Sequence, residues 1–337
     1  MLKPLTFLIA AVALCTLCAQ VVHARCIADP AINLLTDSQR AQVDVAAAQV
    51  PNALGRLYEI SGNNTRGMLF GTFHTAQPDV DLPDEVAARI EQAETLLVEV
   101  TTADQQGAQA MLGLRPDLFM SLDGKGLSDQ LSPQDWTTLS TAAAPLGVPP
   151  HVADRFKPWF AATLVALPEC ELVLQARGGT TLDARAELVA QAAGVTVAPL
   201  ETTLEIFEMM DALEDTVELA FLQTSISTLD LAVPVFIETL DYYQRGEIAH
   251  VAEFADILAA DEIDDPALIE AAEVLETQLL DGRNANWMPT ITAALEAGDT
   301  VIAVGALHLV GETGLVELLR EQGYVVDRIV LEGETAQ

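Results

Sequence analysis

The sequence predicts an α/β (α+β) fold, with a central mixed β-sheet built from N-terminal and C-terminal segments and a large helical insertion between them. Two observations support this prediction. Short apolar runs bounded by turn residues, as expected of buried strands, gather towards the two ends of the chain. The intervening residues, roughly 104–297, are mostly helical in pattern and rich in acidic side chains.

The first 24 residues have the pattern of a secretory signal peptide. Lys3 supplies a positive charge, residues 5–19 form an uncharged apolar stretch, and Val22-His-Ala24 precedes a cleavage point. The apolar stretch is shorter than a membrane-spanning helix requires. We therefore expect a periplasmic or secreted protein whose mature chain, residues 25–337, forms a single domain without a membrane span.

Two of the four cysteines, Cys26 and Cys170, remain once the signal peptide is removed. An even number of cysteines in an exported protein predicts a disulfide between them. Two unpaired thiols are the alternative.

The formal net charge of −34 excludes one class of partner. A surface this acidic repels the phosphate backbone, so we expect no nucleic-acid partner. The sequence also lacks the His-Glu-x-x-His, Gly-x-Ser-x-Gly and glycine-rich phosphate-binding motifs. Familiar zinc proteases, serine hydrolases and nucleotide-dependent enzymes are thereby disfavoured.

Strand and helix patterns can be placed in chain order. The expected strands are residues 56–61, 65–74, 95–100, 195–202, 301–308 and 324–331, with a tight turn between the first two. The helices expected beside them are residues 83–94, 182–193 and 315–322. Pro199 cannot donate a hydrogen bond to a neighbouring strand, which predicts an edge or terminal position for its strand.

Two of the expected strands end in the same motif, Gly-x-x-His. Gly71 precedes His74, and Gly305 precedes His308. A glycine at that place lets a helix, a ligand or a neighbouring strand approach closely. A single histidine at a strand end is usually structural, but the matched pair predicts a functional role.

Two carboxylates occupy the same setting as these histidines. Glu99 and Glu201 lie at or near the carboxyl ends of expected strands, and the ligand crevice of an open α/β sheet lies just outside such ends. Two imidazoles and two carboxylates there would make a first-row metal site or an acid–base pair. Glu99 lies among apolar residues, where a carboxylate is costly without a metal or a cation. Glu201 has an alternative role as a cap of the following helix.

Arg283 and Asn284 form a further candidate pair, just before the last histidine-bearing strand. The arginine could bind a carboxylate or polarise a carbonyl, and the asparagine could orient a ligand or a water molecule. A surface salt bridge is the alternative. Trp287, one turn further on, is expected in the core or in the wall of a cleft.

Taken together and in this order, the motifs resemble the TraB/PrgY/GumN family, whose eukaryotic relatives include the Tiki membrane metalloproteases. The resemblance covers nearly all of the mature chain. It rests on Gly71-Thr-Phe-His74, Leu97-Val-Glu99, Lys157-Pro-Trp159, Leu182-Asp183, Leu200-Glu201-Thr202, Arg283-Asn284 with Met288, and Gly305-Ala-Leu-His308. Pro289 departs from the family pattern, and we expect it to break the helix that holds Arg283 unless a new helix starts there.

The resemblance implies a hydrolase-like site, which in the Tiki relatives is a divalent-metal peptidase. It implies His74, His308 and Glu99 as metal ligands or acid–base groups, with Arg283 and Asn284 in support. We therefore expect an exported, metal-dependent hydrolase, most simply a peptidase, that uses Mn, Co or Zn on a peptide or small-molecule substrate. The other glutamate would move the proton. A metal-free, esterase-like hydrolase and a peptide-binding or haem-binding protein without turnover are the alternatives.

Overall fold

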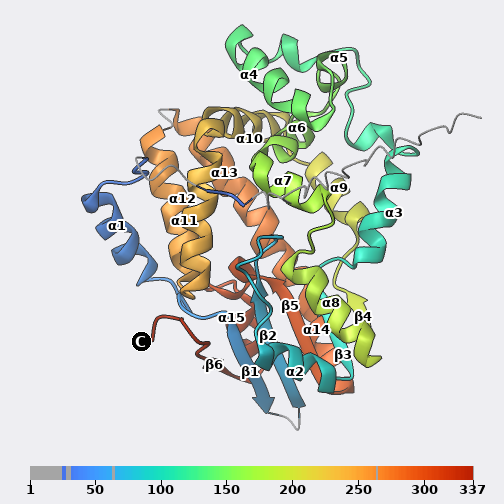
Figure 1. Cartoon of the computed structure of the whole chain (residues 1–337), viewed down its shortest axis with the longest axis vertical. Coiled ribbons are helices and arrows are strands. Elements are labelled where there is room, and N and C mark those ends of the chain that lie inside the picture. Colours follow the sequence, from blue (N-terminus) through green and yellow to red (C-terminus); the bar gives the residue numbers. More distant parts are fainter. Residues whose placement is uncertain (1–24, 28–31, 63–64, 263–264, 337) are drawn as a thin grey trace, which may run out of the picture.

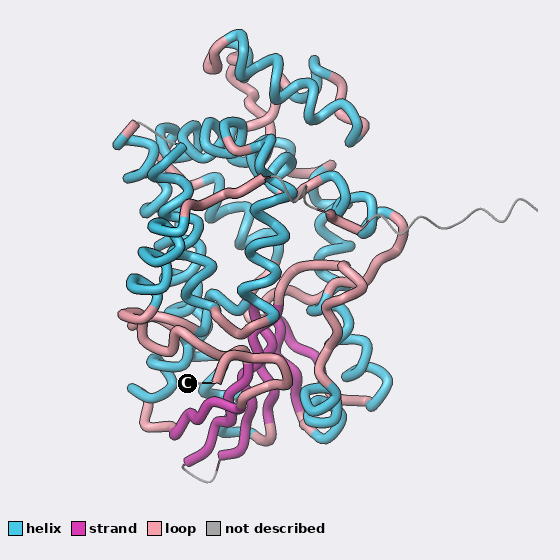
Figure 2. Tube along the Cα trace, turned by 60° about the vertical axis from the view of Figure 1, so that its left-hand side comes forward, coloured by secondary structure: helices cyan, strands magenta, loops and turns pink. Residues whose placement is uncertain are grey.

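The structure is a computed structural model, and it describes residues 25–27, 32–62, 65–262 and 265–336. The expected signal peptide and the turn residues 63–64 lie outside the described residues. Figure 1 shows the strands gathered at one end of the molecule and a stack of helices beyond the ends of the strands. Figure 2 shows the same division from another side.

Six strands form one mixed sheet in the order β4-β3-β5-β2-β1-β6. Strands β4, β3, β5 and β2 are parallel neighbours, whereas β1 is antiparallel to β2 and to β6. The strands are β1 (Leu57–Gly62), β2 (Thr65–Thr72), β3 (Thr95–Val98), β4 (Thr196–Pro199), β5 (Thr300–Gly305) and β6 (Val325–Ile329). The mixed sheet and the edge position of the strand that contains Pro199 are both confirmed.

Helices make up most of the chain between β3 and β5, as the sequence predicts. The helices are α1 (Asp37–Ala47), α2 (Asp84–Gln92), α3 (Thr102–Leu112), α4 (Pro133–Ala143), α5 (Pro150–Ala153), α6 (Pro158–Ala166), α7 (Glu169–Ala176), α8 (Leu182–Ala193), α9 (Thr203–Asp211), α10 (Asp215–Ser227), α11 (Ala232–Gln244), α12 (Ile248–Glu262), α13 (Pro266–Thr277), α14 (Arg283–Ala297) and α15 (Leu315–Glu321). A π-helical turn, η5 (Gln278–Gly282), precedes α14, and a 3₁₀ turn, η6 (Ala306–Leu309), follows β5.

Alternating strand residues build an apolar layer on each face of the sheet, because successive side chains of a strand point to opposite sides. Phe70 and Leu96 face a layer covered by α2, α8 and α11, whereas Leu69 and Leu97 face a layer covered by α14 and α15. Helices thus enclose both faces of the central strands, which explains their nearly continuous apolar sequences. Polar groups of the sheet region gather instead beyond the strand ends.

The helices beyond the sheet have cores of their own. One cluster joins α4, α6 and α10, and another gathers α6, α9, α10 and α13 around Trp159 and Met210. No single helix in the described part of the chain is long and apolar enough to cross a membrane. Two bent pairs, α6 with α7 and α10 with α11, meet that test by length and composition only.

The expected break of the helix at Pro289 is wrong. Helix α14 begins at Arg283 and continues through Pro289 to Ala297. A proline inside a helix removes one backbone hydrogen bond, since it has no N–H to donate. The burial of Trp287 and Ile291 against the sheet holds the two sides of the helix together across that gap. Arg283 is therefore placed firmly at the start of a packed helix.

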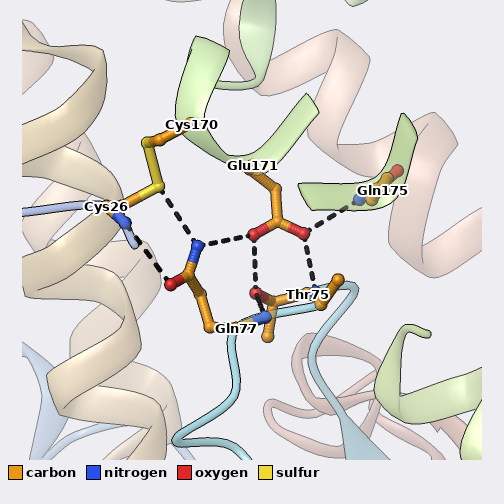
Figure 3. Close-up of a disulfide and its surroundings, with 7 residues drawn as sticks. Cys26, Thr75, Gln77, Cys170, Glu171 and Gln175 are labelled. Carbon is orange, nitrogen blue, oxygen red and sulfur yellow. Dashed lines mark hydrogen bonds between the residues drawn. A yellow bond between two sulfur atoms is a disulfide. The ribbon is translucent and has the colours of Figure 1, made fainter. Parts of the chain in front are cut away.

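The expected disulfide is present between Cys26 and Cys170, whose Cα atoms lie 5.3 Å apart. It ties the N-terminal segment to the first turn of α7 across 144 residues of sequence. Figure 3 shows the bond beside a group of buried polar side chains.

Candidate active site

The four ionisable residues that the sequence singles out lie just beyond the carboxyl ends of four adjacent strands. His74 follows β2, Glu99 follows β3, Glu201 follows β4, and His308 lies in the turn η6 after β5. The strand expected to reach His308 ends earlier, at Gly305, and the 3₁₀ turn presents the histidine instead. Since these strands are parallel neighbours, their ends meet at one edge of the sheet.

Glu99 lies at the centre of the site, with a side chain that is 10% exposed. Its Oε1 accepts a hydrogen bond from the Gly305 N–H at 2.6 Å, and its Oε2 accepts one from Arg283 Nη2 at 2.6 Å. Burial raises the pKa of Glu99, but the neighbouring imidazoles, the guanidinium and the Gly305 N–H outweigh burial and lower the pKa to about 2. Glu99 is therefore a stable carboxylate with a cationic partner.

Arg283 bridges the two glutamates. Besides its bond to Glu99, its Nε donates to Glu201 Oε1 at 2.7 Å, and its Nη2 also contacts that oxygen. The guanidinium carbon lies 4.8 Å from the centre of the Trp287 ring. The arginine side chain is 12% exposed, so the group is a buried ion-pair cluster rather than a surface salt bridge.

Glu201 does not cap the helix that follows it. The cap of α9 is Thr202, whose hydroxyl accepts a bond from the Glu205 N–H while the Glu205 carboxylate bonds back to the Thr202 N–H. Burial raises the pKa of Glu201 above its ordinary value, and the contacts with Arg283 offset that rise only in part. The two glutamates thus share one arginine but have pKa shifts in opposite directions.

His308 is buried and held in one tautomer. Its Nδ1 lies 2.8 Å from Asn284 Oδ1, and the Asn284 amide nitrogen donates to the carbonyl oxygens of His308 and Thr313. Because the amide nitrogen is used as a donor, Oδ1 must accept, and the proton lies on Nδ1. Burial lowers the pKa of His308 to about 4, so the imidazole is neutral and its Nε2 accepts a hydrogen bond from Arg283 Nη1 at 3.2 Å.

His74 is held in the same way by a carboxylate. Its Nδ1 lies 2.8 Å from Asp183 Oδ2, and the Thr72 hydroxyl donates to the other oxygen of Asp183. The charge of Asp183 raises the pKa of His74 to about 10. The side chain of His74 is 62% exposed, in contrast to that of His308, which is 4% exposed. His74 is thus largely exposed to solvent, whereas His308 is buried.

The two imidazoles converge on the same atom. The Nε2 atoms of His74 and His308 each lie 3.8 Å from Glu99 Oε1. Gly305 borders the space between these three groups. A Cβ atom on Gly305 would lie 3.1 Å from Glu99 Oε1, 3.6 Å from His74 Nε2 and 3.6 Å from His308 Cδ2. The absence of a side chain at Gly305 therefore leaves room at the meeting point.

The two motif glycines are expected to respond differently to alanine. Gly305→Ala fills the space between the imidazoles without backbone strain, because its φ of −52° suits any residue, and only Glu99 Oε1, 3.1 Å from the new Cβ, must shift slightly. Gly71→Ala brings a Cβ to 2.9 Å from the Cα of Ala306, so backbone must move, at a cost of about 1–3 kcal/mol. Thermal unfolding and a ligand titration separate the two effects. A large stability loss in Gly305→Ala would contradict this assignment.

The family resemblance implies a divalent ion, and imidazole nitrogens and a carboxylate oxygen are ligand types that such an ion accepts. Among the described residues, no group of three or more His, Cys, Asp or Glu side chains has a geometry that could hold a metal ion. However, both histidines have Nδ1 held by an oxygen, as metal-ligating histidines usually do. Two imidazoles with one carboxylate are a known ligand set for catalytic zinc. Arg283 Nη1 lies 3.2 Å from His308 Nε2, so an ion would have to displace that contact.

A model of the TraB/PrgY/gumN family matches residues 56–328, a range that includes every residue of this site. The chain belongs to the TraB/PrgY/gumN family. The resemblance seen in the motifs is thereby confirmed. A comparison with curated proteins finds no match.

In this member of the TraB/PrgY/gumN family, the structure adds Thr72, Asp183 and Trp287 to the site. Asp183 belongs to the Leu182-Asp183 motif that carries the family resemblance, but its sequence context indicates no role in the site, because an acidic residue in the first turn of a helix is ordinary. Trp287 packs against His308 with ring centres 4.5 Å apart. The sequence placed Trp287 in the core or in a cleft wall, and it is both buried and in contact with the site.

Proposed function

We propose that this chain is an exported, metal-dependent hydrolase that cleaves peptide bonds. One observation supports the proposal above all: two imidazoles, each with Nδ1 held by an oxygen, direct Nε2 towards the same oxygen of Glu99. His74, His308 and Glu99 would hold the ion. The chemistry that a bound Mn, Co or Zn ion supplies in such a site is polarisation of the scissile carbonyl and a lower pKa of the attacking water.

The opposite pKa shifts of the two glutamates suggest separate roles. Glu99, whose pKa is lowered, suits a permanently charged ligand. Glu201, whose pKa is raised by burial, is closer to the range in which a carboxyl group can accept and return a proton at neutral pH. We therefore assign the proton transfer to Glu201.

Arg283 has two roles in this scheme. Its guanidinium holds Glu99 and Glu201 at a constant separation through hydrogen bonds to both. As a fixed positive charge at the carboxyl edge of the sheet, it would also stabilise negative charge that develops on the carbonyl oxygen. Asn284 acts through His308, because its side-chain oxygen fixes the tautomer of that imidazole.

The proposal that the protein is exported draws on the disulfide as well as on the N-terminal sequence. Disulfides persist in oxidising compartments such as the bacterial periplasm and the outside of the cell. The bond between Cys26 and Cys170 suits such a compartment. A periplasmic or secreted location also suits an enzyme that acts on peptides.

Metal content tests the proposed function directly. The purified mature chain is expected to bind about one divalent ion, measured by elemental analysis after dialysis against Mn, Co or Zn. His74→Ala and His308→Ala are each expected to abolish binding while the fold is retained, because each removes an imidazole ligand. His151→Ala, which changes an exposed histidine in α5, is the matched control. Equal metal content in all four proteins would rule out the metal-dependent scheme.

Metal-free hydrolysis is a second candidate, favoured by the contact between His74 and Asp183. A carboxylate that orients an imidazole is the arrangement of a general base in many hydrolases. The raised pKa of His74 argues against that role, because a protonated imidazole cannot accept a proton. Metal binding at His74 would likewise have to displace the Nε2 proton, since only a neutral imidazole binds a metal ion. Peptide cleavage that survives exhaustive chelation, and is lost in His74→Ala, would establish the metal-free mechanism.

A further inference from the structure

The loop that follows His74 is held by a buried carboxylate with neutral partners. Glu171, in the first turn of α7, is 0% exposed. Its Oε1 accepts hydrogen bonds from the Ala76 N–H at 2.6 Å and from the Gln175 side chain at 3.0 Å. Its Oε2 accepts bonds from the Thr75 hydroxyl and the Gln77 side chain, each at 3.0 Å. Figure 3 shows Thr75, Gln77 and Gln175 around the carboxylate.

Burying the Glu171 carboxylate costs free energy unless hydrogen-bond donors replace its lost water. A carboxylate removed from water needs several donors to replace its hydration, and hydrogen bonds to a charged group are stronger than those between neutral groups. Three of the four donors belong to the consecutive residues Thr75, Ala76 and Gln77, directly after His74. The network thus fixes the backbone on the carboxyl side of the histidine.

The disulfide adjoins the same network. Cys170 is the residue before Glu171, and Gln77 Nε2 lies 3.2 Å from Cys26 Sγ. The Cys26 N–H donates in turn to Gln77 Oε1 at 3.4 Å. One glutamine side chain therefore contacts the carboxylate and the disulfide together, as Figure 3 shows.

The segment from α7 to α8 holds both sides of His74. Glu171 fixes the backbone after the histidine, and Asp183, early in α8, holds the imidazole. The turn between the two helices packs on the same loop, since a Cβ on Gly179 would lie 3.0 Å from the Cβ of Ala76. A movement of α7 would therefore displace the loop that follows His74.

We propose that Glu171 is a positioning residue for His74 and that the disulfide between Cys26 and Cys170 braces it, so that the site is fully ordered only in the oxidised chain. The proposal rests on the proposed function in that His74 is a site residue. A dithiol reductant would donate two electrons and two protons to the sulfur–sulfur bond. Two cysteine thiols form, and the reductant closes into its own cyclic disulfide.

Three variants of the mature chain test this proposal. Glu171→Gln keeps the size of the side chain but removes its charge and turns one acceptor oxygen into an N–H donor. Two of the four hydrogen bonds then lose their acceptor, and the other two keep only a weaker, neutral one. The double variant Cys26→Ser, Cys170→Ser removes the brace. Glu218→Gln, at a buried carboxylate in α10, is the matched control.

The first measurement is hydrogen exchange of the Ala76 amide, which reports the network itself. We expect exchange at least tenfold faster in Glu171→Gln, in the double variant and in wild-type protein reduced with a dithiol, but not in Glu218→Gln. Repeating the measurement at several low denaturant concentrations shows whether the opening is local. The exchange rate rises with denaturant when exchange requires global unfolding, and it stays constant when the opening is local. Unchanged exchange in the double variant would overturn the role of the disulfide.

The second measurement is a cobalt(II) titration followed by absorbance. Loss of the support for a ligand typically weakens metal binding by about 10–100-fold, which is the effect expected in Glu171→Gln and in the double variant. Faster exchange at Ala76 with unchanged cobalt affinity would overturn the positioning role. If the wild type binds no cobalt, the proposed metal-dependent function is contradicted, but the positioning role of Glu171 is still testable. The low-field NMR signal of the His74 Nδ1 proton then decides: its loss in Glu171→Gln supports positioning, and its persistence overturns it.

Discussion

Arg283→Met is expected to lower the free energy of unfolding by about 3–5 kcal/mol, the range observed when one partner of a buried ion pair is removed. Glu99 and Glu201 have side chains that are 10% and 12% exposed, and Arg283 pairs with both. Methionine keeps most of the volume, so the loss would be electrostatic. Chemical denaturation at neutral pH measures it.

Two controls separate this effect from a general cost of losing an arginine. Arg115→Met breaks a pair with Asp117 whose side chains are 41% and 47% exposed, and it should cost far less stability, because solvent screens an exposed ion pair. Adding Glu201→Gln to Arg283→Met removes one of the two carboxylates that have lost their arginine partner, and it should recover part of the stability. Equal losses in the Arg283 and Arg115 variants would contradict a buried role for Arg283.

The sheet was accessible to prediction because its signals are local. Apolar runs of the right length mark each strand, and Pro199 marks an edge through the N–H that it lacks. The strand ends were harder. The run that closes at His308 is apolar throughout, so nothing in it distinguishes the last strand residue, Gly305, from the 3₁₀ turn that follows.

The site was predictable as a set of residues but not as a network. The common position of His74, Glu99 and His308 after strands allowed their convergence to be expected. The bridge that joins Arg283 to Glu99 spans 184 residues of sequence, and such a contact depends on how helices pack. The same holds for Asp183, whose position in a helix gives no sign of the imidazole that it faces.

Asp183→Asn is expected to bring the pKa of His74 from about 10 down towards its ordinary value near 6.5, because the charge of Asp183 is the largest cause of the raised value. Asparagine still offers an oxygen to the His74 Nδ1–H, so the ring should keep its orientation. An NMR titration of the imidazole protons measures the change.

The same substitution should change how stability depends on pH. A histidine with a raised pKa in the folded chain stabilises it fully below the unfolded pKa, and that stabilisation is lost as pH rises through the folded value. In the wild type this loss falls between about pH 6.5 and 10, and Asp183→Asn should remove it. An unchanged slope in denaturation experiments over that range would contradict the assignment.

His308 provides the comparison that makes this prediction specific. Its Nδ1 has the same 2.8 Å contact with an oxygen as that of His74, but the oxygen belongs to the neutral amide of Asn284. Burial therefore dominates and lowers the pKa of His308 to about 4. Asn284→Asp should raise the pKa of His308, as Asp183→Asn lowers that of His74. The charge of each imidazole thus depends on its burial and on the charge of the group that holds its Nδ1, and the two substitutions should shift the two pKa values in opposite directions.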